Sequence, residues 1–210
     1  AADSNYTVSF VTADFTITAA ALTVTADTDQ TKVYGATDPT LTYSITGFEN
    51  GDEEADLDTG VSISRAAGEN VDTYTITPSA AADSNYTVSF VTADFTITQA
   101  ALTVTADSAT KVYGTTDPAL TYSITGFQGT DTEADLDTAV SISRAEGEDV
   151  GTYTITPSAA AASNYTVSFV TADFTITQAV LTVTASDQTK VYGTTDPALT
   201  YSITGFQGTD

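Results

Sequence analysis

Residues 164–169 read Asn164-Tyr165-Thr166-Val167-Ser168-Phe169, and the same residue types stand at 5–10 and at 85–90. Apolar and polar side chains alternate along this stretch, a pattern typical of a β-strand with one buried face. A second stretch, Lys-Val-Tyr-Gly, recurs at 32–35, 111–114 and 190–193. The copies are 79 or 80 residues apart, so the chain is an array of one repeated unit.

The same alternation governs the other segments of the repeat. In residues 102–106, Leu, Val and Ala hold the even positions and Thr holds the odd ones. Similar segments occur at 120–124, 140–143, 153–156 and 174–177. Thr suits the exposed face of a strand, and period two places each apolar set on the opposite face. We therefore predict an all-β fold: tandem small β-sandwich modules, Ig-like or related, of about 79 residues.

The module boundaries follow from the parity of the apolar positions. Phe95 and Ile97 stand on odd numbers, whereas Leu102 and Val104 stand on even ones. One continuous strand cannot serve the same core on both sides of such a change, so a module ends near residues 99–101. We expect complete modules at 21–98 and 101–177, the C-terminal strands of a preceding repeat at 1–18, and the N-terminal strands of a following repeat at 180–210.

The connection between modules is short and contains neither Gly nor Pro. A connection of that composition is expected to be stiff. The sequence therefore predicts modules arranged end to end as a rod.

Composition argues against catalysis and against several classes of partner. The chain has no His and no Cys, which removes the usual neutral-pH acid–base group and the common metal ligands. It has 28 acidic residues and 5 basic ones, and such a surface repels nucleic acid and anionic lipid. No apolar run is long enough to span a bilayer. We expect no enzyme activity, no nucleic-acid partner and no membrane insertion, and we expect contacts with neighbouring repeats of the same chain.

The order of motifs along the repeat carries a family resemblance. Lys111-Val112-Tyr113-Gly114 is followed by Asp117-Pro118, and then by the segments at 147–155, 164–167 and 174–177. In this order the sequence resembles the MBG-type repeats of bacterial surface and adhesin-like proteins. The resemblance implies tandem all-β modules in an extracellular, cell-surface or secreted protein, and it transfers no catalytic residues.

One loop carries most of the acidic side chains of each repeat. Its carboxylates stand at every second position, where they can converge on a hard cation such as calcium. They are Asp52, Glu54, Asp56 and Asp58 in one repeat and Asp131, Glu133, Asp135 and Asp137 in the next. An EF-hand is excluded, because its sixth and twelfth places hold Leu136 and Ile142. The alternatives are specific calcium binding, loose condensation of cations around the loop, and a solvated acidic loop anchored by Leu136.

Other recurrent residues have competing interpretations. Lys111 and Arg144 are expected to pair with carboxylates, and an amide staple between Lys111 and an Asp or Asn side chain is a remote alternative. Asn-Tyr-Thr sequons begin at Asn5, Asn85 and Asn164. The inward parity of Tyr43, Tyr74 and Tyr86 favours core positions over a sugar-stacking platform.

Three functions remain open on the sequence alone. We expect the repeats to extend the stalk of a large secreted bacterial surface adhesin or matrix protein. The first alternative is an extracellular filament, in which copies of the protein associate laterally or through edge strands. The second alternative is a multivalent glycan- or mucin-binding module.

Overall fold

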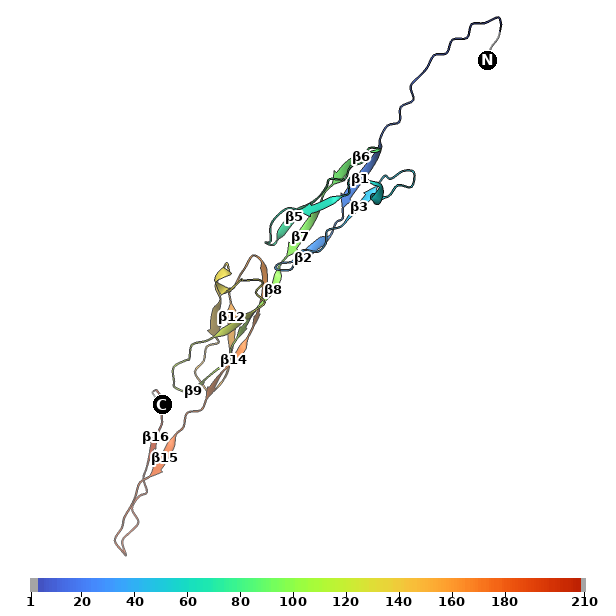
Figure 1. The fold of residues 1–210 in the computed structure, drawn as a ribbon. Coiled ribbons are helices and arrows are strands. Elements are labelled where there is room, and N and C mark those ends of the chain that lie inside the picture. The colour runs from blue at the N-terminus through green and yellow to red at the C-terminus, as the bar shows by residue number, and fades with distance from the viewer. Residues whose placement is uncertain (1–3, 209–210) are drawn as a thin grey trace. The chain divides into compact units, whose positions relative to one another are not determined.

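The computed structural model describes residues 4–208, and nearly all of its regular structure is β-strand (Figure 1). Each complete repeat has seven strands and one short 3₁₀ helix. The first contains β1 (Ala20–Ala26), β2 (Gln30–Val33), β3 (Tyr43–Thr46), η1 (Glu54–Asp56), β4 (Ser62–Arg65), β5 (Asp72–Ser79), β6 (Tyr86–Val91) and β7 (Ala93–Thr98). The second contains β8 (Ala100–Ala106), β9 (Ala109–Val112), β10 (Tyr122–Thr125), η2 (Glu133–Asp135), β11 (Ser141–Arg144), β12 (Gly151–Ser158), β13 (Tyr165–Val170) and β14 (Ala172–Thr177). The prediction of an all-β fold is confirmed.

The strands of each repeat form two sheets with the same topology. In the first repeat the strand orders are β3-β1-β6 and β2-β7-β5-β4, and in the second they are β10-β8-β13 and β11-β12-β14-β9. β1 pairs parallel with β6, with Leu22 opposite Val88, and pairs antiparallel with β3. The parallel pair joins the first strand of the repeat to the sixth, so the fold closes only when most of the repeat is present.

The apolar face of every central strand is buried between the two sheets. In the second repeat, Ala106 of β8 packs with Ile155 of β12 and with Phe174 and Ile176 of β14. These side chains are no more than 5% exposed. Each fully buried aliphatic or aromatic side chain stabilises the fold by about 1.5–3 kcal/mol. The period-two pattern therefore identified the faces that form the core.

The change of parity between repeats coincides with a change of strand. β7 buries Phe95 and Ile97 and ends at Thr98. β8 begins at Ala100 and buries Leu102 and Val104, which stand on even numbers. Across the short segment around Gln99, the buried positions change from odd to even numbers.

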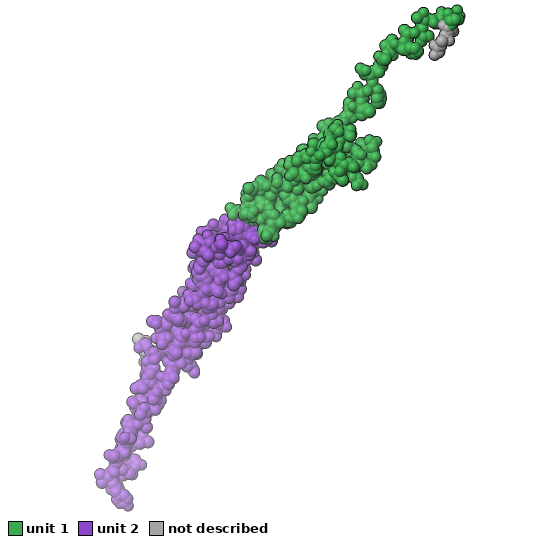
Figure 2. Space-filling model, in the orientation of Figure 1, with its two compact units in different colours: residues 1–32, 36–98 green, residues 33–35, 99–210 purple. Residues whose placement is uncertain are grey.

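The chain divides into two compact units (Figure 2). The first comprises residues 1–32 and 36–98, and the second comprises residues 33–35 and 99–210. The three-residue stretch Val33–Gly35 thus belongs to the second unit, although Val33 is the last residue of β2 in the first repeat.

The two end fragments differ from their counterparts in the complete repeats. Residues 6–18 contain no strand, whereas the same sequence forms β6 and β7 further along the chain. At the other end, β15 (Thr182–Ala185) and β16 (Tyr201–Thr204) form an antiparallel pair in the register of β1 and β3. Residues 1–3 and 209–210 of the expected fragments lie outside the described residues. Within residues 4–208 the only helices are η1 and η2, so no helix there is long and apolar enough to cross a membrane.

The repetition provides a matched test of the core. Phe174 is fully buried, whereas Phe15, at the same place in the repeat, is 90% exposed. We expect Phe174→Ala to lower the free energy of unfolding of the second unit by about 3–5 kcal/mol, because it removes a large side chain and leaves a cavity. Phe15→Ala should change stability by less than about 0.5 kcal/mol. Urea denaturation, monitored by hydrogen exchange, measures the change in unfolding free energy for each substitution. Equal changes for the two substitutions would contradict this assignment of the core.

Candidate functional site

The acidic loop of the second repeat lies between β10 and β11 and contains η2. The sequence pattern placed its carboxylates on alternate positions, as they would stand along one face of a strand. A 3₁₀ helix has about three residues per turn, so alternate residues do not share a face. The four carboxylates of the loop accept hydrogen bonds from three places in the repeat: the start of β13, β10 and the loop itself.

Asp131 and Asp137 tie the loop to the start of β13. The Tyr165 hydroxyl donates to Oδ2 of Asp131 at 2.6 Å, and the Gln128 backbone N–H donates to the same hydroxyl at 2.8 Å. Burial and the neighbouring Asp131 raise the pKa of Tyr165 to about 12, so the phenol stays a proton donor. Oδ2 of Asp137 accepts from both the backbone N–H and the hydroxyl of Ser163, each at 2.6 Å.

The two remaining carboxylates stabilise η2 and its contact with β10. Asp135 accepts a hydrogen bond from the Thr132 backbone N–H at 2.8 Å, which completes a capping box. Glu133 accepts from the hydroxyl of Tyr122, a β10 residue. In the first repeat Asp52, Glu54, Asp56 and Asp58 accept from the equivalent donors, which are Tyr86, Tyr43, the Glu53 N–H and the Ser84 N–H.

The structure therefore assigns these carboxylates a role in holding the loop. Among residues 4–208, no three acidic side chains are grouped so that they could hold a metal ion. The calcium binding that the sequence suggested for Asp131, Glu133, Asp135 and Asp137, and for their counterparts in the first repeat, stays untested. Their hydrogen bonds favour the alternative of an acidic loop held by the protein itself.

Because each carboxylate already has its own protein donor, we expect calcium to act on this loop only by screening. Millimolar calcium should then raise the melting temperature no more than sodium chloride of equal ionic strength. Differential scanning calorimetry in the two salts is the measurement. A larger shift with calcium would show that the loop rearranges into a specific site.

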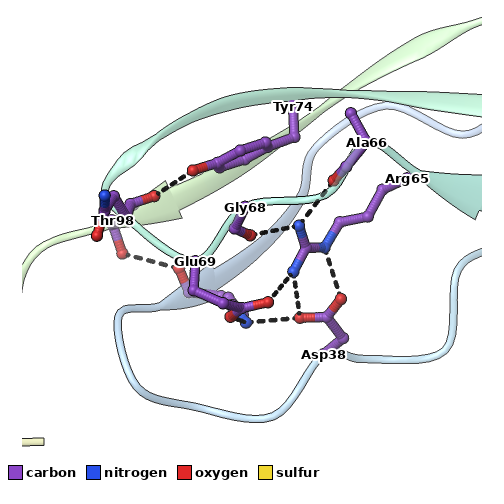
Figure 3. A network of polar contacts seen from close by, with 9 residues as sticks. Asp38, Arg65, Ala66, Gly68, Glu69, Tyr74 and Thr98 are labelled. Atoms are coloured by element: carbon purple, nitrogen blue, oxygen red, sulfur yellow. Dashed lines mark hydrogen bonds and ion pairs between the residues drawn. The ribbon is translucent and has the colours of Figure 1, made fainter.

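A second polar cluster, the ion-pair network, surrounds two buried cations in each complete repeat, and Figure 3 shows part of it in the first repeat. In the first repeat, Nζ of Lys32 lies 2.6 Å from Oδ1 of Asp38 and also contacts Glu69. Nε of Arg65 lies 2.5 Å from Oδ2 of Asp38, and Nη2 lies 2.6 Å from Glu69. The side chains of Lys32 and Arg65 are only 3% and 7% exposed. The same arrangement occurs in the second unit, where its members are Lys111, Asp117, Arg144 and Glu148.

The arginine of this network covers the core. The Arg144 guanidinium carbon lies 4.7 Å from the centroid of the Phe174 ring and 5.6 Å from that of Tyr153. Its Nη1 also donates to the backbone carbonyls of Ala145 and Gly147, at 2.9 and 2.7 Å. A cation over an aromatic face is stabilising, more so where water is excluded. The network therefore covers part of the apolar core, at the Phe174 ring, as well as balancing charge.

The electrostatics favour ion pairs over a covalent staple. Hydrogen bonds from Arg144 and Lys111 lower the pKa of Asp117 to about 2, and hydrogen bonds to Asp117 and Glu148 raise the pKa of Lys111. Amide formation would need a neutral amine and a protonated carboxyl, and both shifts act in the opposite direction. The lysine and the carboxylate are held as ions.

The sequence contained a signal for this network. Arg144 follows the inward parity of Ile142, and Lys111 follows that of Ala109, so both cations point toward the core rather than to solvent. The sequence pattern could not predict that Arg144 pairs with Asp117, because the two residues are 27 positions apart and come from different segments.

The inward tyrosines occupy the positions that their parity indicates. Tyr86 is 8% exposed, and Tyr43 and Tyr74 are half-buried. Asn85 is exposed immediately before β6, whereas Asn164 is half-buried. Glycosylation of either sequon stays a prediction.

The lowered pKa of Asp117 gives a pH dependence of stability. The ionised carboxylate is favoured in the folded state, so its stabilisation is complete above the ordinary value of 3.8 and is lost as the pH falls through about 2. We expect Asp117→Asn to lower stability at pH 7 and to flatten the decline between about pH 4 and 2. Urea midpoints at several pH values measure this.

Asp196 provides the control, because it is the equivalent residue of the third repeat and its side chain is 80% exposed beside Lys190. Asp196→Asn should leave the acid profile unchanged. An Asp117→Asn protein that keeps the wild-type profile would contradict the role assigned to the network.

Comparison with known protein families finds one match. The family model described as "MBG domain (YGX type)" matches the chain at residues 22–96, 102–175 and 181–210. The first two segments cover nearly all of the two complete repeats, and the third covers the final fragment. A comparison with curated proteins finds no match.

Proposed function

The chain belongs to the family of MBG domains of the YGX type, and from this premise we propose that its repeats are structural extenders in the stalk of a large secreted bacterial surface adhesin or matrix protein. The family is one of structural repeat domains, and its repeats are typical of surface proteins. The observation that carries the proposal is the tandem occurrence of the domain three times in near-identical copies. Copies of one sequence supply length and valency rather than distinct sites.

The polar groups of the repeat support the same conclusion. Charged side chains gather in the acidic loop and in the ion-pair network, and in both the charges are engaged by donors and acceptors of the protein itself. These contacts stabilise the module. Such an arrangement suits a unit whose task is to stay folded at the cell surface.

An extended arrangement of the repeats can be tested directly. Because the connection at residues 99–101 contains neither Gly nor Pro, we expect small-angle X-ray scattering of the whole chain to give the cross-sectional profile of a rod. Measurements at low and high salt separate a stiff connection from simple repulsion between acidic modules. A compact, bell-shaped distance distribution in both salts would reject the stalk proposal.

One observation favours a second candidate function, an extracellular filament built from copies of this protein. β6 and β13 are edge strands, and each ends in two exposed apolar residues. These are Phe90 and Val91 in the first repeat and Phe169 and Val170 in the second, at 40–46% exposure. Such edges are able to pair between molecules, but the net charge of −23 opposes it. A scattering mass that rises with salt would support the filament, and a constant monomer mass would support the stalk.

A further inference from the structure

Tyr34 and Gly35 form a turn after β2, yet they pack within the second compact unit (Figure 2). The ring of Tyr34 meets that of Tyr165 edge to face, with centroids 5.3 Å apart and an interplanar angle of 77°. The Tyr34 hydroxyl donates to Oδ2 of Asp131 at 2.9 Å. This is the oxygen that also accepts from Tyr165, so one carboxylate holds both phenols.

The apolar surroundings of Tyr34 belong to the second repeat. Tyr34 packs against the buried cluster of Ala100, Leu102 and Tyr165. Phe127 completes the site, with its ring 5.9 Å from that of Tyr165 at 84°. We call Phe127, Asp131 and Tyr165 the tyrosine socket.

Gly35 is required beside the socket for two reasons. Its φ is +79°, a conformation that side-chain-bearing residues rarely adopt. A Cβ added to Gly35 would also lie 2.4 Å from Cβ of Gln128, which is too close for any larger residue. The backbone of the turn therefore approaches the second repeat as closely as the absence of a side chain allows.

The other repeats show that this contact recurs. A Cβ on Gly114 would lie 2.3 Å from Cβ of Gln207, the counterpart of Gln128. By contrast, no atom lies within 4 Å of a Cβ built on Gly193, and Tyr192 beside it is fully exposed. Within residues 4–208, the close contact is thus present at Gly35 and Gly114, each with the Gln at the equivalent position of the next repeat.

The first repeat carries the same socket without a tyrosine from another repeat in the described residues. Phe48 and Tyr86 lie 5.9 Å apart at 84°, the values found for Phe127 and Tyr165. The Tyr86 hydroxyl donates to Oδ2 of Asp52 at 2.8 Å. The geometry is the same in both repeats, so the socket is formed before it is filled and does not have to be ordered by its occupant.

From these observations we propose that the Tyr-Gly turn of an MBG repeat is a docking element, and that its receptor is the tyrosine socket of the repeat that follows. The surface formed by Phe48, Asp52 and Tyr86 accordingly fits the Tyr-Gly turn of another repeat. Docking adds a nearest-neighbour contribution to the stability of each repeat, as in other repeat arrays. The inference deepens the proposed structural role but rests on contacts that are independent of where the protein resides.

A double-mutant cycle in the whole chain tests the docking. Tyr34→Phe removes the hydroxyl and keeps the ring, and Asp131→Asn removes the charge that it contacts. We expect Tyr34→Phe to accelerate hydrogen exchange of residues 126–137 by roughly ten- to a hundredfold, the effect of losing one hydrogen bond to a charged group. Combined with Asp131→Asn, the effects of the two substitutions should be less than additive.

Two matched controls use the repetition of the chain. The effects of Tyr34→Phe and Asp52→Asn should add, because Asp52 is the counterpart of Asp131 and lies in the other compact unit. Tyr192→Phe should leave exchange throughout the chain unchanged. Additivity of Tyr34→Phe with Asp131→Asn, or an unchanged exchange rate in Tyr34→Phe, would overturn the proposal. Either result would leave the scattering test of the stalk untouched, so the two ideas fail separately.

Discussion

Everything in this repeat depends on burying a small apolar face between a three-stranded and a four-stranded sheet. The face is narrow, because each strand contributes only two or three inward residues, such as Phe95 and Ile97 of β7. A core of that size cannot cover its own ends. Arg65 therefore lies over the Phe95 ring, 5.2 Å from its centroid, and its charge is balanced by Asp38 and Glu69. The buried cations follow from the need to close the core without additional apolar residues.

The acidic composition has a related explanation within the fold. The loop between β3 and β4 has no strand partners along most of its length, so its backbone and the neighbouring tyrosine hydroxyls need acceptors from side chains. Asp52 accepts from Tyr86, and Asp58 accepts from the Ser84 backbone N–H. Carboxylates are strong acceptors for such donors, and they keep the surface highly charged. A single residue type thus orders the loop and gives the modules a like charge that opposes aggregation.

The alternation of apolar and polar residues was sufficient to locate the strands, but it was insufficient to predict which strands pair. Alternation located the inward faces, and the change of parity between Ile97 and Leu102 located the boundary between β7 and β8. Nothing in the alternation specifies that Leu22 of β1 lies opposite Val88 of β6, because parity is satisfied by many pairings. The same limit applies to the acidic loop. The spacing of the carboxylates did not specify their donors, which a short 3₁₀ helix at Glu133–Asp135 places in different parts of the repeat.

The chain also shows how far neighbours decide the structure of an identical sequence. Residues 92–98 and 12–18 have the same sequence, but only the former reaches β5 and β2, and only the former contains a strand. Tyr34 and Tyr192 stand at the same place in the repeat, but one is held by Asp131 and the other is fully exposed. A repeated position therefore has the contacts of its repeat only where the strands that provide them are present. If the Tyr-Gly turn docks as proposed, each repeat is stabilised partly by the next, and lengthening the array adds docking contacts as well as modules. Such coupling would help a stalk under tension. Local opening of a docked module would have to break the contact with its neighbour as well as contacts within the module.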